Sequence, residues 1–113
     1  FEEKGWPSKG YECQINTSHS DDRKTGSLYG TQDVLKNAPS HDDEWFDYPI
    51  TVKGKNIKIA INGKDVVNYT EPENPERPNS FKGRLLGEGT FGIQGHDPKS
   101  VTFLKDIKVK VLK

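Results

Sequence analysis

Apolar residues recur at every second position in several stretches of the chain, and nowhere do they keep the spacing of an amphipathic helix for more than about one turn. Because alternate side chains of a strand point to opposite faces, this pattern predicts β-structure. The expected strands and hairpins cover residues 11–17, 25–30, 45–52, 56–69, 91–93 and 101–111. The sequence therefore indicates an all-β protein.

The clearest local signal is the sequence KNIKIAINGKDVVNY. Three isoleucines alternate with lysine and alanine before Asn62-Gly63, and Val66, Val67 and Tyr69 follow. Asn-Gly supplies the two positive-φ positions that a type I′ turn requires. We therefore expect two antiparallel strands joined at Asn62-Gly63.

The last strand is expected in VTFLKDIKVKVLK. Its apolar residues share one face: Val101, Phe103, Ile107, Val109 and Val111. Leu104 falls on the other face, which indicates a bulge near Leu104 and Lys105.

Prolines mark two other places in the chain. Pro49 indicates that its strand lies at a sheet edge or contains a bulge, and prolines at 72, 75 and 78 predict an exposed loop.

Strands with one apolar and one polar face need a second layer, so the expected architecture is an antiparallel sandwich or barrel. We count about six or seven strands, which is few for a closed two-sheet body. With 113 residues, of which 30% are hydrophobic, the chain has material for one domain, residues 1–113.

The charge balance narrows the class of partner. Lys plus Arg and Asp plus Glu number 17 each, and no basic run is interleaved with aromatics, so neither nucleic acid nor a membrane surface is an expected partner. A small neutral ligand fits better. Cys13 is the single cysteine, which excludes an intrachain disulfide without fixing the compartment. The chain begins at Phe1 and contains no Met, which indicates a mature or truncated piece and leaves room for an export signal before it.

Four blocks of sequence, in order, resemble a known family: GYECQI, TGSLYG, EWFDYPITVKGKNIKIAINGKDVVNY and TFGIQGHDPKSVTFLKDIKVKVL. From about Gly10 to Leu112 the chain is similar to the 3-keto-disaccharide hydrolase domain, also called domain of unknown function 1080. The resemblance implies a concanavalin-like jelly roll, related in shape to lectins and laminarinase-type glycosidases. It leaves the compartment open, with export to the periplasm or cell envelope among the options.

The resemblance also implies that this chain is the C-terminal portion of a jelly roll, incomplete at its N-terminus. Domains of the family normally carry several strands before the segment that matches Gly10 to Ile15. Without them, sheet edges and apolar faces would be uncovered, which is a physical liability. We therefore expect a second chain, or N-terminal strands that are missing here, to complete the sandwich.

The first strand carries the first candidate site. Tyr11, Cys13 and Ile15 are expected to point inward, and the opposite, polar face consists of Glu12, Gln14 and Asn16. Short polar side chains with fixed hydrogen-bond geometry suit sugar hydroxyls, but an ordinary strand also has a polar solvent face. The resemblance implies that this strand lines the concave face of the sheet, which favours a substrate-binding role.

His96 and Asp97 lie where a predicted strand breaks into a turn. Binding residues concentrate at such strand ends, and an imidazole titrates near neutral pH. The alternative is that Asp97-Pro98 only initiates a turn and His96 is its neighbour. Because the resemblance implies a histidine or similar polar group at this strand end, both readings stay open.

Tyr29 and Trp45 are the candidates for an aromatic platform that stacks against a sugar ring, although Trp45 would serve equally well in a core. Trp6, in a Gly-Trp-Pro turn, is open to either reading. Two histidines lie beside acidic residues, His19 near Asp21 and His41 before Asp42. Such clusters can bind a divalent metal, but solvated loops are the commoner outcome. A metal held by Glu12 and His96 would have too few ligands to be asserted.

The resemblance implies hydrolysis of 3-keto-glycosides. The ketone acidifies the neighbouring C2–H, so a base can remove that proton, the glycosidic bond leaves by elimination, and water adds later. Glu12 and His96 are the expected acid and base, in either order, with Gln14 and Asp97 orienting them. A non-catalytic, lectin-like sugar-binding module is the alternative, because one fold serves both functions.

Overall fold

The fold is built around a β-hairpin in the middle of the chain. In a computed structural model, which describes residue 5 and residues 7–113, strands β2 (Asn56–Ile61) and β3 (Lys64–Thr70) pair antiparallel. Asn62 and Gly63 between them have φ angles of 49° and 79°, the two positive values of a type I′ turn. The predicted hairpin is confirmed.

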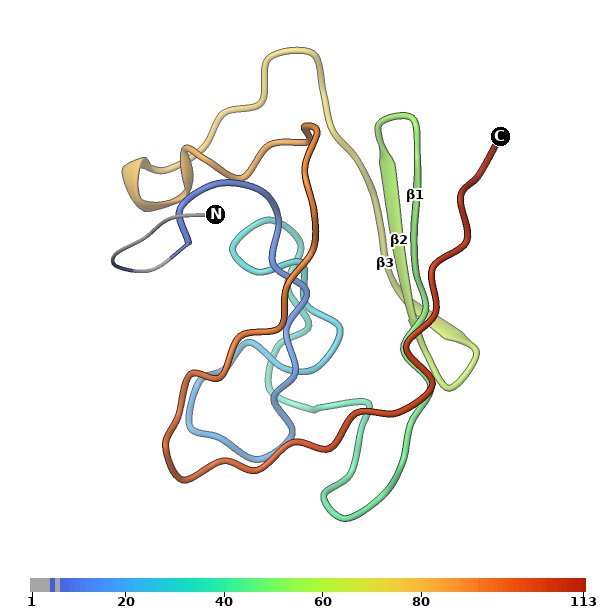
Figure 1. The fold of residues 1–113 in the computed structure, drawn as a ribbon. Helices are drawn as coiled ribbons and strands as arrows, with labels where there is room; N and C mark the ends of the chain where they lie inside the picture. Colours follow the sequence, from blue (N-terminus) through green and yellow to red (C-terminus); the bar gives the residue numbers. More distant parts are fainter. Residues whose placement is uncertain (1–4, 6) are drawn as a thin grey trace.

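A third strand, β1 (Ile50–Lys53), extends the sheet in the order β1-β2-β3 (Figure 1). Pro49 lies directly before β1, and its carbonyl accepts a hydrogen bond from the Ala60 N–H at 3.2 Å. Within the described residues β1 pairs with β2 alone, so the expectation that Pro49 marks a sheet edge is confirmed.

The hairpin contains a bulge that explains two consecutive valines. Ile59 pairs with Val67 and Ala60 with Asp65, so Val66 is the additional residue on β3. The register shift leaves Val67 in the core, 2% exposed, and turns Val66 toward the N-terminal segments, where it packs against the core from the side.

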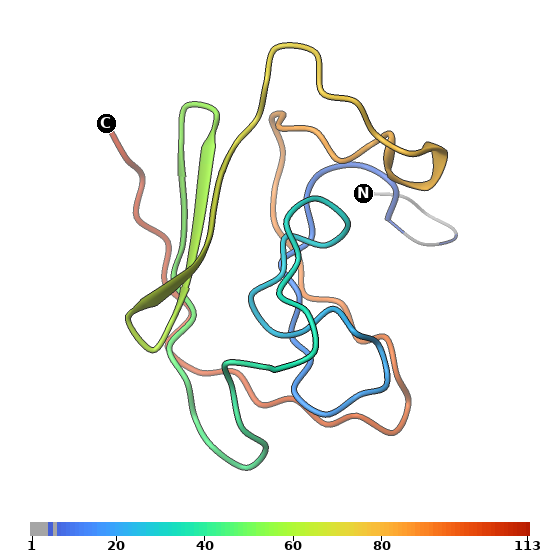
Figure 2. The same ribbon diagram turned by 180° about the vertical axis from the view of Figure 1, so that it is seen from behind.

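The core lies on one face of this sheet. Its buried members are Leu28, Ile57, Ile59 and Val67, and six half-buried residues pack against them: Tyr11, Cys13, Tyr48, Val66, Tyr69 and Leu86. Residues 11–16 and 25–29 supply the layer that covers β2 and β3 (Figures 1 and 2). The predicted inward direction of Tyr11 and Cys13 is therefore confirmed, whereas Ile15 is exposed.

The strands predicted at 11–17 and 25–30 pair over a shorter stretch than expected. Cys13 forms an isolated antiparallel bridge with Leu28, and the Gln14 N–H donates to the Ser27 carbonyl at 3.0 Å. Gly26, beside this bridge, has a φ of 89°, which interrupts the extended backbone that a longer ladder needs.

The expected strands at 91–93 and 101–111 are not formed, and this part of the prediction is wrong. Residues 87–113 run along the molecule as a trace without regular structure (Figure 1, orange to red). A strand is defined by its ladder, and no described segment pairs with the backbone of residues 101–113. The predicted irregularity near Leu104 and Lys105 has a counterpart one residue later, where Asp106 adopts a φ of 54°.

The all-β class is confirmed. The described residues contain one three-stranded sheet and a short 3₁₀ helix, η1 (Asn79–Phe81), which ends the loop predicted from its prolines. The complete two-sheet sandwich stays a prediction. In the part of the chain that the structure describes, no helix has the length and apolar character that a membrane crossing needs.

Candidate functional site

Glu12 is held by a nearly buried arginine from a distant part of the chain. The Arg84 guanidinium donates to Glu12 Oε2 at 2.9 Å and to the Gly10 carbonyl at 3.2 Å. Arg84 is 8% exposed, while 31% of the Glu12 side chain remains accessible. The ion pair therefore fixes the direction of a carboxylate that still reaches solvent.

The other two polar residues of the strand, Gln14 and Asn16, differ in the number of hydrogen bonds that their side chains make. The Asn16 amide donates to the Asp21 and Arg23 carbonyls at 2.9 and 2.8 Å, and its oxygen accepts from the His19 N–H at 3.0 Å. Asn16 thus organises the loop that follows it. The Gln14 side chain is half-buried and makes no hydrogen bond within the described residues, so its amide is available to a ligand.

Tyr29 is packed on both its ring and its hydroxyl. The Arg23 guanidinium lies 4.8 Å from the ring centroid, and Phe81 meets the ring edge-on at 6.2 Å. The hydroxyl donates to Asp21 Oδ2 at 2.8 Å. Burial, and then the hydrogen bond to Asp21, raise the pKa of Tyr29. The Arg23 guanidinium therefore already covers part of the Tyr29 ring on which a sugar was expected to stack.

Trp45 is not a core residue, because its side chain is 60% exposed. Lys105 Nζ lies 4.3 Å from the ring centroid, within the range of a cation–π contact. This contact ties the C-terminal segment to the loop before β1. Trp6 lies outside the described residues.

Asp97 forms the turn that its sequence predicts. Its carboxylate accepts from the Lys99 N–H at 3.1 Å and from the Ser100 hydroxyl at 2.8 Å, which is an Asx-type turn. The Lys99 N–H, and then the Ser100 hydroxyl, lower the pKa of Asp97, and the charges of His19 and His96 add to this effect. His96 is exposed beside it, so the turn at 96–100 and the loop that Asn16 organises come close to each other.

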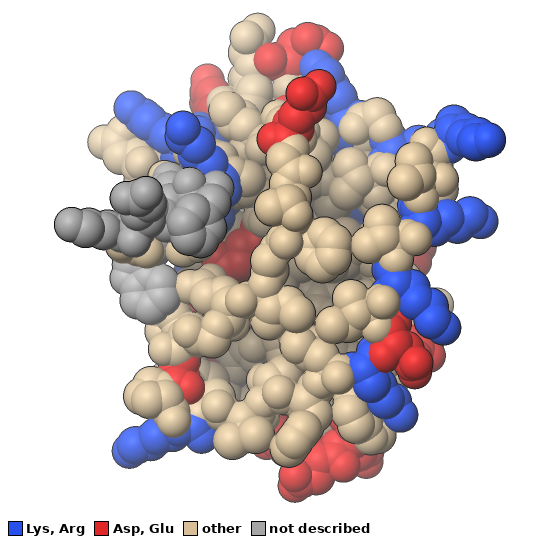
Figure 3. Space-filling view, viewed as in Figure 1, with Lys and Arg blue, Asp and Glu red and all other residues tan. Residues whose placement is uncertain are grey.

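All seven predicted site residues line one continuous space between the C-terminal segment and the rest of the protein: Glu12, Gln14, Asn16, Tyr29, Trp45, His96 and Asp97. Its volume is about 3950 Å³. In Figure 3 this face is hollowed and its centre is largely free of charged side chains, which gather toward the rim. All three histidines of the chain, His19, His41 and His96, line this hollow together with Glu12, so the shared lining does not single out His96.

A model of the 3-keto-alpha-glucoside-1,2-lyase-like domain matches residues 1–110. The chain belongs to this family. The resemblance inferred from the four sequence blocks is therefore confirmed, and it supports a carbohydrate-related function in general terms. Searches of curated proteins and of solved structures found no match.

Sequence reasoning missed the residue that organises the candidate site of this lyase-like domain. Arg84 stands in FKGRLLG two positions after Lys82, so no local signal distinguishes it from its neighbour. Its partner Glu12 is 72 positions away, so no local pattern links them.

A second polar network, also missed, lies on the other side of the first strand. The Tyr11 hydroxyl donates to Glu71 Oε2 at 2.6 Å and accepts from Arg77 Nη2 at 2.8 Å, and Arg77 also donates to the Tyr69 hydroxyl. Burial and the bond to Glu71 raise the pKa of Tyr11 well above its usual range. This network fastens the start of the strand to the loop after β3.

The described residues do not assemble a metal site. No three His, Cys, Asp or Glu side chains of residue 5 and residues 7–113 converge on one point. In one of the two acidic clusters, Asp21 serves its own loop: it accepts from the Arg23 N–H at 2.9 Å and from the Tyr29 hydroxyl at 2.8 Å. These residues do not fit a metal with three protein ligands, and no chemical step is derived through one.

Proposed function

We propose that this chain forms the sugar-binding face of an enzyme that cleaves 3-keto-glycosides, with Glu12 and His96 as the proton-transfer pair. The main support is membership in the 3-keto-alpha-glucoside-1,2-lyase-like family, which supports the choice of substrate class. Glu12 and His96, 84 positions apart in the chain, both border the hollow, and the contact with Arg84 fixes the direction of the Glu12 carboxylate.

The reaction needs two proton transfers. A base takes the C2 proton of the sugar, which the C3 ketone makes acidic; the C1–O bond then breaks as the C1=C2 bond forms. An acid gives a proton to the departing oxygen, and water adds across C1=C2 afterwards. The scheme differs from ordinary glycoside hydrolysis, in which two carboxylates act on an oxocarbenium-like transition state.

Glu12 is suited to one of these transfers by its surroundings. Arg84 contacts Oε2 at 2.9 Å, and Oε1 makes no hydrogen bond within the described residues. A carboxylate fixed through one oxygen presents the other in a defined direction, which is what proton transfer requires. His96 would perform the second transfer, and the amide of Gln14 would bind a sugar hydroxyl.

The test uses a nitrophenyl 3-keto-glucoside and follows release of nitrophenol. We expect Glu12→Gln, which keeps the contact with Arg84, and His96→Ala each to lower the rate at least about 100-fold, the usual contribution of a general acid or base. The matched controls are Glu76→Gln, at an exposed acid on another loop, and His41→Ala, at an exposed histidine that borders the same hollow; both should stay within about twofold of the parent protein.

A second readout identifies the mechanism. Elimination removes the C2 proton, and the later addition of water across C1=C2 returns a proton from solvent, so the sugar released in heavy water should carry deuterium at C2. A released sugar without deuterium at C2 would indicate ordinary glycosidase chemistry, and full activity of His96→Ala would remove that residue from the mechanism.

A non-catalytic sugar-binding module is the second candidate. It is favoured by the ion pair between Glu12 and Arg84 and by the structural use of the Asn16 amide, since both side chains already have protein partners. Binding of 3-keto-trehalose without turnover, unchanged by added Mn²⁺, would support this function over the enzyme.

A further inference from the structure

Phe81, the last residue of η1, contacts the arginine that holds the Glu12 carboxylate. The Phe81 carbonyl accepts from the Arg84 N–H at 2.9 Å, which closes the turn between them. The Arg84 guanidinium lies 6.0 Å from the centroid of the Phe81 ring, at the outer limit of a cation–π contact. The main chain and the side chain of Phe81 therefore both help to place Arg84.

Tyr29 connects the same aromatic ring to the main chain of Glu12. The Tyr29 ring meets Phe81 edge-on, with 6.2 Å between the ring centroids, and the Tyr29 N–H donates to the Glu12 carbonyl at 2.9 Å. Four residues thus contact one another in a closed cycle, from Glu12 to Tyr29, Phe81, Arg84 and back to the Glu12 carboxylate.

The Phe81 ring is itself confined by its surroundings. A Cβ added to Gly30 would lie 2.8 Å from Phe81 Cε1, so a glycine is needed for this close approach, and the φ of Gly30 is 70°. The Arg23 guanidinium lies 5.8 Å from the ring centroid. Contacts from several segments therefore restrict where the ring can lie.

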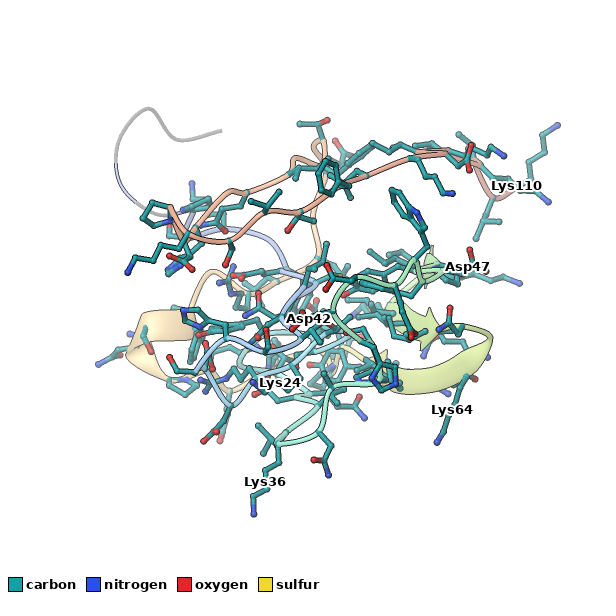
Figure 4. All side chains as sticks on the ribbon, turned by 90° about the horizontal axis from the view of Figure 1, so that it is seen from below. Lys24, Lys36, Asp42, Asp47, Lys64 and Lys110 are labelled. Carbon is teal, nitrogen blue, oxygen red and sulfur yellow. The ribbon has the colours of Figure 1, made fainter. Side chains whose placement is uncertain are left out.

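The Phe81 ring is not placed to touch a sugar. Glu12 and Arg84 line the hollow, whereas Phe81 does not. In Figure 4, η1 lies beside the N-terminal segments, and the C-terminal segment that carries Lys110 runs along the other side. A ligand in the hollow would meet Glu12 and Arg84, so an effect of the Phe81 ring on the chemistry would pass through these neighbours.

The position of the Glu12 carboxylate matters for the proton transfer assigned to it. A displacement of about 1 Å at a reacting group can cost about 100-fold in rate. The Arg84 guanidinium joins Glu12 Oε2, at 2.9 Å, to the Gly10 carbonyl, at 3.2 Å. A shift of this guanidinium would therefore shift the carboxylate.

We propose that Phe81 is a positioning residue for the proton transfer at Glu12: its ring holds the Arg84 guanidinium, and the guanidinium holds the carboxylate. The proposal rests on the proposed function. It concerns the ring alone, because a change of the Phe81 side chain leaves the main-chain hydrogen bond to Arg84 in place.

The first test needs no substrate. Nitrogen-15 NMR measures how fast each arginine guanidinium rotates about its Nε–Cζ bond. In Phe81→Leu, which removes the ring but keeps an apolar side chain, we expect Arg84 to rotate at least about threefold faster, as the loss of a cation–π contact implies. Arg77, which lies over the Tyr11 and Tyr69 rings instead, serves as internal reference.

Phe46→Leu is the matched control. Phe46 is also half-buried and lies beside a tyrosine ring, that of Tyr48, with 6.2 Å between the centroids. Within the described residues, no arginine lies over Phe46, in contrast to Phe81. Phe46→Leu should therefore leave the rotation of Arg84 within about twofold of the parent protein.

The second test follows release of nitrophenol from the nitrophenyl 3-keto-glucoside. Phe81→Leu should lower kcat about tenfold and leave KM within about twofold, because the carboxylate is displaced while the contacts with the sugar remain. Added to Glu12→Gln, the same change should cost less than about twofold further, because both changes act on one group. A ring that only stabilised the fold would not produce this dependence.

Gly30→Ala displaces the Phe81 ring without replacing it. It should speed the rotation of Arg84 and lower kcat in the same direction as Phe81→Leu. Gly63→Ala is its control, because the φ of Gly63 is also positive, at 79°, and nothing lies within 4 Å of the added Cβ. Hydrogen-exchange protection of the β2–β3 hairpin verifies that Phe81→Leu and Gly30→Ala are folded.

Two results would overturn the proposal. Unchanged rotation of Arg84 in folded Phe81→Leu would show that the ring does not hold the guanidinium. A loss of rate that adds in full to that of Glu12→Gln would show that the ring acts elsewhere. A parent protein that releases no nitrophenol would count against the proposed function instead, and the rotation of Arg84 would still decide whether the ring holds it.

Discussion

Gly26 allows the site-bearing strand to approach the hairpin, and replacing it should be costly for two separable reasons. Its N–H donates to the Gln14 carbonyl at 3.0 Å, and its φ is 89°. A Cβ added there would lie 2.6 Å from Val66 Cγ2 and 3.3 Å from Ile61 Cγ1. Because valine is stiff at χ1, the Val66 methyl cannot turn away freely.

The free-energy cost of Gly26→Ala is the sum of these two effects. A left-handed backbone costs an alanine about 1–2 kcal/mol, and overpacking a filled site costs about 1–3 kcal/mol. We therefore expect the free energy of unfolding to fall by about 2–5 kcal/mol. Gly63→Ala is the matched control: its φ is 79° and nothing lies within 4 Å of the added Cβ, so only the backbone cost applies.

A double-mutant cycle separates the two contributions. Val66→Ala removes the methyl that the Cβ introduced by Gly26→Ala would strike, so the two changes together should cost less than the sum of the single changes, by about 1–3 kcal/mol. Urea unfolding followed by tryptophan fluorescence gives each value from the midpoint and slope. If Gly26→Ala costs no more than Gly63→Ala, and the cycle is additive, then Val66 does not limit this position and the reasoning fails.

Two further predictions follow from shifted pKa values. Burial raises the pKa of the Cys13 thiol to about 11, so the thiol is protonated at pH 8 and reacts poorly with iodoacetamide. Mass spectrometry should find Cys13 unmodified in the folded protein and alkylated in urea. Rapid alkylation of the folded protein would contradict this prediction. The pKa of Asp97 is lowered in the folded protein, so its ionised carboxylate stabilises the turn at any pH above the ordinary carboxyl pKa. This stabilisation is lost as the pH falls through the lower pKa of the folded state, and hydrogen exchange of the Lys99 N–H should become faster in that pH range. Titration of Asp97 at the ordinary carboxyl pKa would refute the turn.

The sequence was sufficient wherever the determinants were local. Asn62-Gly63 and the alternating isoleucines specify the hairpin within 15 residues, and Pro49 marks the edge strand correctly. The last predicted strand failed for a different reason. Val101 to Val111 have the right alternation, but a ladder needs a second backbone, and alternation in one segment does not reveal whether that backbone is present.

In the candidate site, too, the sequence predicted what local alternation determines and missed what depends on distant segments. Alternation placed Tyr11 and Cys13 toward the core and Glu12 away from it, and the roles of the seven candidate residues stay predictions. The direction of the Glu12 carboxylate could not be predicted, because it depends on Arg84 from a remote segment. Contacts of that kind come from the folded chain and not from any window of sequence.

The long-range fastening of the first strand has a consequence for how the protein folds. The hairpin closes over a few residues, whereas Tyr11 meets Glu71 across 60 positions and Glu12 meets Arg84 across 72. Closing a loop of that length costs more entropy than closing the hairpin, so we expect the ion pair to be absent from the rate-limiting transition state. Weakening it should then shorten the lifetime of the native state while leaving the speed of its formation almost untouched.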